Sequence, residues 1–273
     1  MEGAPAHARH RSSGPERARP NSGRAIGELL LTAGAVLLLY VFYEAFWTNI
    51  VSARLQDEVD SGLTESWGNG ASGDESVAAA PPAPGEGFAR VHIPALDAAY
   101  AVVEGTRNED LRAGPGHYVD TQMPGEPGNF ALAGHRIGTG AVFQHLDRLD
   151  TCDAVVVETE FRWITYRVLP LGNDQLGRRA EAAACLSPEQ VDRVADGDYA
   201  HVVGRHITTP DDIEVVNPLP GAPWVEPHSG LESTLTLTTC HPLFSNTERM
   251  IVHAVRVESV SKSAGTLPAA LQE

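Results

Sequence analysis

Residues 234–240 read Thr-Leu-Thr-Leu-Thr-Thr-Cys, and hydroxyl and leucine side chains alternate in this stretch up to Thr238. A period of two is typical of a half-buried β-strand. Cys240 ends the predicted strand and, by the same period, lies on the face of the threonines, opposite Leu235 and Leu237. Buried, inert thiols usually lie on the leucine face. The stretch therefore predicts a β fold in which one thiol points out of the core into a cleft.

A thiol that attacks a carbonyl needs a base or a positive charge nearby, because a free cysteine with a pKa of roughly 8.5 is mostly protonated at neutral pH. Arg249 starts the next apolar run, and the loop from His241 to Glu248 contains Pro242 and other turn residues. Two adjacent strands would thus return Arg249 to Cys240. Arginine is no base at physiological pH, but it can hold a carbonyl and stabilise an oxyanion.

The base is expected to be His135, which follows a short apolar strand at residues 129–134. Gly134 would let a substrate backbone approach the His135 ring closely. His241 is set aside, because consecutive residues of a strand project to opposite faces. Each residue alone has a commoner structural explanation, since cysteines fill cores, Gly-His pairs are frequent and arginines head solvated strands. Their combination predicts a cysteine transpeptidase site.

These residues resemble the sortases, whose signature is Thr-Leu-X-Thr-Cys with an upstream histidine and an arginine on the following strand. The resemblance covers about residues 88–258, and its further blocks are similar to class E sortases of actinobacteria. The blocks are Gly114-Pro-Gly-His-Tyr118, Pro124-Gly-Glu-Pro-Gly-Asn129, Ala133-Gly-His-Arg136, Phe143 with Leu146-Asp147, and Cys240-His-Pro242.

The resemblance implies a mostly β fold, a closed sortase-type β-barrel with short helices, preceded by one transmembrane helix. It further implies that Cys240 is the nucleophile, His135 the general acid and base, and Arg249 the oxyanion and substrate clamp. Such an enzyme cleaves a signal similar to Leu-Ala-X-Thr-Gly between Thr and Gly. It holds the Thr carbonyl as a thioester and transfers it to an amine of the cell wall, on a peptidoglycan precursor or cross-bridge. No cofactor is expected, and the sequence has no metal-ligand spacing, although it does not decide whether a metal ion influences the groove.

Substrate contacts are expected at Ala133, Gly134, Thr139 and Thr239. Thr139 departs from the family pattern, because class E sequences usually carry a tyrosine there, and this change predicts a looser pocket beside His135. His117 and Tyr118 belong to a matched block, but we interpret them as structural.

Composition divides the chain into five parts. Residues 1–24 form a basic tail, 25–47 an apolar anchor long enough to span a bilayer, and 48–87 an acidic linker rich in Pro, Gly and Ser that is expected to be disordered. The catalytic domain covers 88–262, and 263–273 is expected to be a flexible tail. Arginines before the anchor predict a cytoplasmic N-terminus and an extracellular catalytic domain in a single-pass protein of the cell membrane. The alternative is that the apolar run belongs to a signal peptide.

Charge makes nucleic acid an unfavourable partner, because the chain carries a net charge of −16 and the part after the basic tail has 15 basic against 34 acidic residues. The expected partners are sorting-signal peptides, a wall amine and the membrane. Two other functions stay open: a cysteine endopeptidase that releases its product to water, and a catalytically silent barrel that binds peptides. Cys152 and Cys185 either form a disulfide outside the cytoplasm, which leaves Cys240 free, or remain two free thiols.

Overall fold

The structure, a computed structural model, describes residues 22–43, 48–69, 81–172, 174–265 and 267–273. The chain divides into two compact units, residues 1–44 and 45–273. The first holds helix α1, Ser22–Phe42, in which Gly23–Phe42 is long and apolar enough to cross a membrane. A signal sequence near an N-terminus meets the same criterion. Trp47 and residues 1–21 of the expected basic tail lie outside the described residues.

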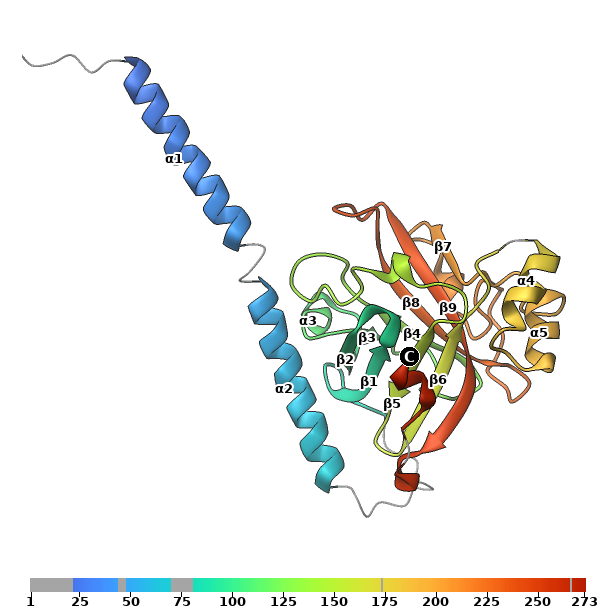
Figure 1. Ribbon diagram of the computed structural model, residues 1–273. Coiled ribbons are helices and arrows are strands. Elements are labelled where there is room, and N and C mark those ends of the chain that lie inside the picture. The colour runs from blue at the N-terminus through green and yellow to red at the C-terminus, as the bar shows by residue number, and fades with distance from the viewer. Residues whose placement is uncertain (1–21, 44–47, 70–80, 173, 266) are drawn as a thin grey trace, which may run out of the picture. The chain divides into compact units, whose positions relative to one another are not determined.

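The second unit is built around a closed barrel of antiparallel and parallel strands (Figure 1). The strand order is β6-β5-β1-β2-β3-β4-β8-β9, and β6 also pairs with β9, which closes the sheet. Only β2 with β3 and β4 with β8 pair in parallel among the described strands. The short β7 pairs with the first half of β9. The strands are β1 Gly87–Ile93, β2 Ala98–Glu104, β3 Gly116–His117, β4 Gly128–Ala133, β5 Ala154–Glu158, β6 Arg162–Val168, β7 Arg205–Thr208, β8 Ser233–His241 and β9 Glu248–Ser261. The predicted barrel is confirmed.

Both faces of β8 are buried over Ser233–Thr239, which corrects the expectation of a half-buried strand. Leu235 and Leu237 point into the barrel core. The threonine face is covered by the 3-10 helix η4, Ile213–Val216, together with Asn129 of β4. The alternating hydroxyls therefore mark polar packing against a second layer, because buried hydroxyl groups need hydrogen-bond partners.

Small helices decorate the barrel. Helices α4, Gln175–Ala182, and α5, Pro188–Ala195, pack together around Tyr199 as a second apolar cluster. A disulfide joins Cys152 to Cys185, with Cα atoms 5.8 Å apart, so the bridged alternative is confirmed. The remaining short helices are α3 Asn108–Leu111, η2 Pro94–Leu96, η3 Leu146–Arg148, η5 Lys262–Ala264 and η6 Ala269–Gln272.

The prediction of a disordered linker over 48–87 is wrong for its first half. Residues Thr48–Asn69 form helix α2, which packs against β1 and β2 of the barrel (Figure 1). Ser52, Gln56, Val59 and Leu63 recur every three or four residues and share one face of this helix. The average composition predicts a spacer, whereas this periodic face provides side chains that the helix buries against the barrel. Residues 70–80 of the linker lie outside the described residues.

The prediction of a flexible C-terminal tail is also wrong for its end. Ala270 is buried against Ala154, Val156 and Trp163. Glu273 accepts two hydrogen bonds from the Arg167 guanidinium, both 2.7 Å long. An apolar anchor and a bidentate ion pair hold η6 on the barrel.

Candidate active site

The β8–β9 hairpin places Cys240 opposite Arg249. The two residues are direct partners in the antiparallel register, near the last residue of β8 and the first residue of β9. The eight residues between them contribute the loop that begins after His241, so the expected hairpin is confirmed. Cys240 is partly exposed and carries a free thiol. Its side chain continues the face of Thr238, beyond the part of β8 that η4 covers.

The parallel pairing of β4 with β8 brings His135 to the same place. Ala133 pairs with Thr238, and the Gly134 amide donates to the Thr238 carbonyl at 3.0 Å. The Thr239 hydroxyl donates to the Gly134 carbonyl at 2.8 Å. Gly134 and Thr239 directly precede His135 and Cys240, and they are hydrogen-bonded to each other although they are about a hundred residues apart in the chain.

Gly134 is required by packing. A Cβ atom on this residue would collide with the ring of Phe143 and would lie 2.8 Å from Val142. The glycine therefore permits the close approach between β4 and the loop that returns from His135. Gly134 also lines the cavity around Cys240, and the expected approach of a substrate backbone there stays a prediction.

One cavity of about 390 Å³ connects the expected catalytic residues. Cys240, His135 and Arg249 all line it, as do the predicted contact residues Ala133, Gly134 and Thr239. Thr139 is not among the residues that line it, and the predicted substrate contact at Thr139 stays a prediction. The other lining residues are Thr106, Asn108, Leu111, Tyr118, Thr238 and Asn246.

Burial lowers the pKa of His135 from its ordinary value of 6.5. Loss of hydration disfavours the charged imidazolium, so the ring is neutral at physiological pH and is able to accept a proton. The Arg249 guanidinium donates to the backbone carbonyls of Asn246 at 3.1 Å and Glu248 at 2.9 Å. Two backbone contacts thus orient a permanently charged group at the wall of the cavity.

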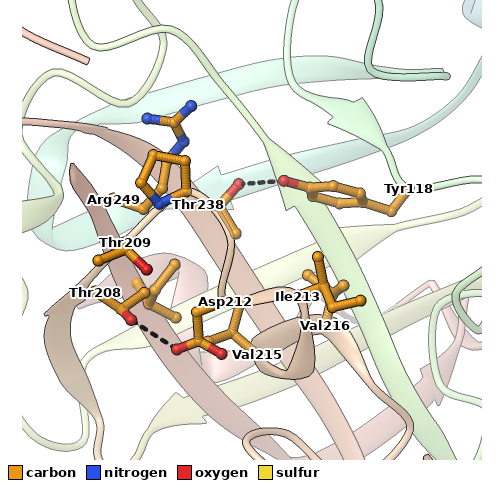
Figure 2. A pocket seen from close by; sticks show the side chains of 11 residues that line it. Tyr118, Thr208, Thr209, Asp212, Ile213, Val215, Val216, Thr238 and Arg249 are labelled. Atoms are coloured by element: carbon orange, nitrogen blue, oxygen red, sulfur yellow. Dashed lines mark hydrogen bonds between the residues drawn. The ribbon is translucent and has the colours of Figure 1, made fainter. Parts of the chain in front are cut away.

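A second, smaller cavity of about 110 Å³ adjoins the first (Figure 2). Tyr118, Thr238 and Arg249 line both cavities, and the Tyr118 hydroxyl is 3.0 Å from that of Thr238. Apolar side chains of η4 and β9 form much of its wall, among them Ile213, Val215, Val216 and Ile251. The arrangement offers an apolar recess beside a charged, open groove.

Two other histidines near the site have structural partners. His241 Nδ1 lies 2.7 Å from Nη1 of Arg136, and His241 does not line the cavity of Cys240. His117 is buried, with Nδ1 2.8 Å from a carboxylate oxygen of Glu104. Both placements agree with the interpretation of these residues as non-catalytic. Tyr118 differs, because it lines both cavities.

A sequence model of the sortase domain matches residues 91–257. The chain belongs to the sortase family. Sortases are cysteine transpeptidases, and this sortase is 32% identical over 254 residues to sortase SrtE1 of Streptomyces coelicolor. That match covers 89% of this chain and 60% of the relative, so the chain spans about 60% of the relative's length.

Solved structures agree with the sortase fold. The SrtF sortase from Corynebacterium diphtheriae has a TM-score of 0.69 and 51% sequence identity, and the match covers 71% of this chain and 98% of that one. Sortase E1 from Streptomyces coelicolor, solved with a tripeptide in the active site, has a TM-score of 0.50 and 30% identity. This match covers 70% of this chain and 99% of the Streptomyces coelicolor chain. The predicted resemblance to class E sortases is confirmed.

Sequence reasoning missed several residues that line the two cavities. Thr106, Asn108 and Leu111 lie on or beside α3, and the η4 residues come from a long irregular segment between β7 and β8. Neither segment has a periodic pattern that predicts its position. The one available signal was Tyr118, a large side chain within a matched block.

Proposed function

We propose that this chain is a membrane-anchored sortase that cleaves a C-terminal sorting signal similar to Leu-Ala-X-Thr-Gly and transfers the protein to a cell-wall amine. The observation that carries the proposal is the convergence of Cys240, His135 and Arg249 on one cavity from three separate segments. A silent binding barrel would have no need to bring a partly exposed thiol, a neutral imidazole and a guanidinium together.

The proposed chemistry has two acyl-transfer steps. Neutral His135 takes the proton of the Cys240 thiol, the resulting thiolate attacks the carbonyl carbon of the signal's Thr, and Arg249 stabilises the negative charge that develops on the carbonyl oxygen. When the C–N bond breaks, protonated His135 gives its proton to the departing Gly amine, and a thioester remains. An incoming amine then attacks the thioester, His135 removes a proton from its nitrogen, the C–S bond breaks, and the Cys240 thiolate leaves and takes that proton from His135.

The two cavities support a division of the substrate. The larger one, around Cys240, is open enough for the Thr-Gly bond and the incoming amine. The smaller one has the volume and the apolar wall that suit a Leu side chain at the start of the signal. Arg249 and Tyr118 lie between them, where a guanidinium and a phenol hydroxyl can hold the backbone of an extended peptide.

The proposed location is the outer face of the cell membrane, with the N-terminus in the cytoplasm. Helix α1 supports the anchor, and the arginines before it support the orientation. The disulfide supports a catalytic unit that folds in an oxidising compartment. The proposed partners are sorting-signal peptides of exported proteins and an amine of peptidoglycan or its precursor.

The test is turnover of a Leu-Ala-X-Thr-Gly peptide, with mass spectrometry of products formed with and without an amine acceptor. We expect Cys240→Ala and His135→Ala to abolish product formation while the melting temperature stays near that of the wild type, because both side chains lie at the cavity and outside the core. His241→Ala is the matched control and should retain most activity. Cleavage by Cys240→Ala would contradict the proposal. Release of product to water alone, even with an amine present, would favour the endopeptidase.

A further inference from the structure

We infer that α2 is a structural part of the active site, in which Ser52 and Gln56 are positioning residues that hold the cavity wall on the side of His135. This inference rests on the proposed function, and it extends that function to a helix outside the region that the family model matches.

Ser52 contacts the loop that follows His135. Its hydroxyl oxygen accepts a hydrogen bond from the Gly140 amide at 2.6 Å. The same loop is closed by the Phe143 amide, which donates to the His135 carbonyl at 3.1 Å. Because the loop is short and closed on His135 itself, a contact that fixes Gly140 limits how far the backbone of His135 moves.

Gln56 lies one turn later on the same face of α2 and contacts a second part of the wall. Its side-chain oxygen accepts from the Ala101 amide at 2.9 Å, and its amide group donates to the carbonyls of Ala101 and Ala113. Ala113 closes the segment that contains Thr106, Asn108 and Leu111, all of which line the Cys240 cavity. The side chain of Gln56 therefore ties this wall to the edge of β2.

The two walls also touch each other. A Cβ atom on Gly140 would collide with the Leu111 carbonyl oxygen and would lie 3.1 Å from the Arg112 Cα, so the His135 loop rests directly on the end of α3. Gly140 has a φ of +78°, a conformation that favours glycine. Ser52 and Gln56 thus hold two backbone segments that already pack together, one that follows His135 and one that contains three lining residues of the cavity.

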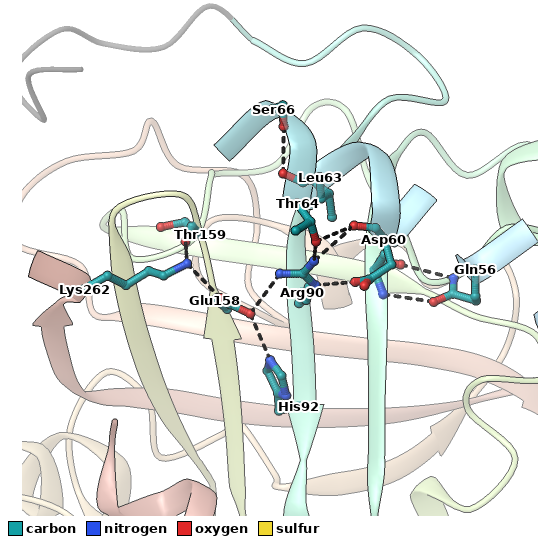
Figure 3. A network of polar contacts seen from close by, with 11 residues as sticks. Gln56, Asp60, Leu63, Thr64, Ser66, Arg90, His92, Glu158, Thr159 and Lys262 are labelled. Atoms are coloured by element: carbon teal, nitrogen blue, oxygen red, sulfur yellow. Dashed lines mark hydrogen bonds and ion pairs between the residues drawn. The ribbon is translucent and has the colours of Figure 1, made fainter. Parts of the chain in front are cut away.

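The other end of α2 fixes the helix on the barrel (Figure 3). Leu63 is buried, and Arg90 of β1 forms an ion pair with Asp60 and donates to the Thr64 hydroxyl at 2.7 Å. The Trp67 ring lies 4.8 Å from the Arg90 guanidinium carbon and 4.3 Å from the Lys262 ammonium. These contacts lie two to four turns away from Ser52, and none of these residues lines the Cys240 cavity.

Charge strengthens this attachment. Burial would raise the pKa of Glu158, but hydrogen bonds from His92 and Lys262, and the charges of Lys262 and Arg90, lower it to about 2. Glu158 therefore stays ionised at neutral pH between Arg90 and Lys262, the two cations that lie against Trp67. The two ends of α2 thus have different chemistry, since one end anchors the helix and the other contacts the cavity wall.

Because the two ends of α2 have different contacts, enzyme kinetics can distinguish a positioning role of Ser52 and Gln56 from a purely structural role of the helix. In the full-length chain in detergent micelles, we expect Ser52→Ala to lower kcat for the signal peptide by about tenfold, with KM changed less than about twofold, because small displacements of a catalytic group cost rate more than binding. Ser52→Thr keeps the hydroxyl and should restore kcat. Gln56→Leu should lower kcat in the same direction. Glu58→Gln, on the exposed face of α2, is the matched control and should leave kcat unchanged.

A second measurement requires no substrate. Hydrogen exchange of the Gly140 amide should be faster in Ser52→Ala than in the wild type and in Glu58→Gln, while the β8 amides keep their protection. Unchanged kcat in Ser52→Ala, or unchanged Gly140 exchange, would overturn the inference. An inactive wild type would instead contradict the proposed function, and the exchange measurement would still decide whether Ser52 holds the loop.

Discussion

At the scale of single residues, Arg249 has the most distinctive position. It faces Cys240 in the strand register, it lines both cavities, and its side chain is oriented by two backbone carbonyls. We expect Arg249→Ala to lower kcat/KM for a signal peptide by on the order of 10², the usual cost of one lost oxyanion donor. Arg249→Lys should recover only part of this loss, because a single ammonium does not reproduce a planar fork.

Peptide cleavage assays under matched conditions measure both variants. Wild-type kcat/KM in Arg249→Lys would show that charge alone is sufficient, and would contradict the expected role of the guanidinium geometry. The melting temperature of each variant checks that the hairpin remains intact.

The three expected catalytic residues could be predicted from the sequence because each follows or starts an apolar strand, and strand ends are where a barrel exposes side chains. Thr139 could not be placed in the same way. It lies in a turn flanked by two glycines with positive φ, and nothing in a turn's composition decides which way its side chain points. Its difference from the class E pattern therefore has no assigned effect on the substrate.

At the scale of elements, β8 and β9 share a polar contact inside the molecule. The Thr236 hydroxyl is 2.9 Å from Nδ1 of His253, and both side chains are buried. Burial is the largest cause that lowers the pKa of His253, and the charges of the nearby His206 and His201 lower it further, to about 3. The folded protein thus keeps this ring neutral at a pH where the unfolded chain protonates it.

The sign of the effect on stability follows from this difference. Above pH 6.5 neither state binds the proton, and below it the unfolded state binds one that the folded state excludes. The free energy of unfolding should therefore fall with decreasing pH, by up to about 1.4 kcal/mol per pH unit between roughly 6 and 3. We expect His253→Gln to flatten the decrease between pH 6 and 5, measured by urea unfolding. An equal slope in both proteins would contradict the assignment to His253.

Helix α2 is the element that composition concealed. Its many Asp, Glu, Ser and Gly residues are typical of a spacer, and only the repeat of Ser52, Gln56, Val59 and Leu63 indicates a face that contacts something. Two of these four side chains are polar, so a search for apolar periodicity gives a weak signal. The surfaces that cover them belong to β1, β2, the segment that ends at Ala113 and the loop that holds Gly140, and the local sequence of the helix does not reveal them.

The anchoring end of α2 is testable by substitution. Leu63 is 2% exposed and packs at the start of β1, where a Cβ on Gly87 would lie 3.4 Å from its side chain. We expect Leu63→Ala to reduce the free energy of unfolding by about 2 kcal/mol, at the lower end of the range for buried leucines because the site is peripheral. Glu65→Gln, on the exposed face of the same turn, is the control and should change the free energy of unfolding little. A change below about 0.5 kcal/mol would show that α2 is not anchored there.

At the scale of the whole molecule, the disulfide connects the turn before β5 to the α4–α5 pair, across a separation of 33 residues. The chain has three cysteines, so the bridge leaves Cys240 as the one free thiol. Thiol counting on the denatured, unreduced protein should therefore give one reactive group per chain. Three reactive groups would contradict the bridge.

Replacing both bridged cysteines by serine should cost roughly 3–4 kcal/mol of unfolding free energy, by the entropy of the loop that the bridge closes. Transpeptidation at low temperature should persist, because neither Cys152 nor Cys185 lines the cavity around Cys240.

The attachment of α2 also affects whether the chain's own lysine can react with the proposed thioester. Lys262 is the only lysine in the chain, and its ammonium donates to Glu158 at 2.7 Å while it lies against the rings of Trp67 and Trp163. These contacts hold the Lys262 ammonium on the barrel surface. The proposed thioester is consumed by amines, and the one side-chain amine of the chain is held in these contacts, so we expect little self-acylation between neighbouring copies.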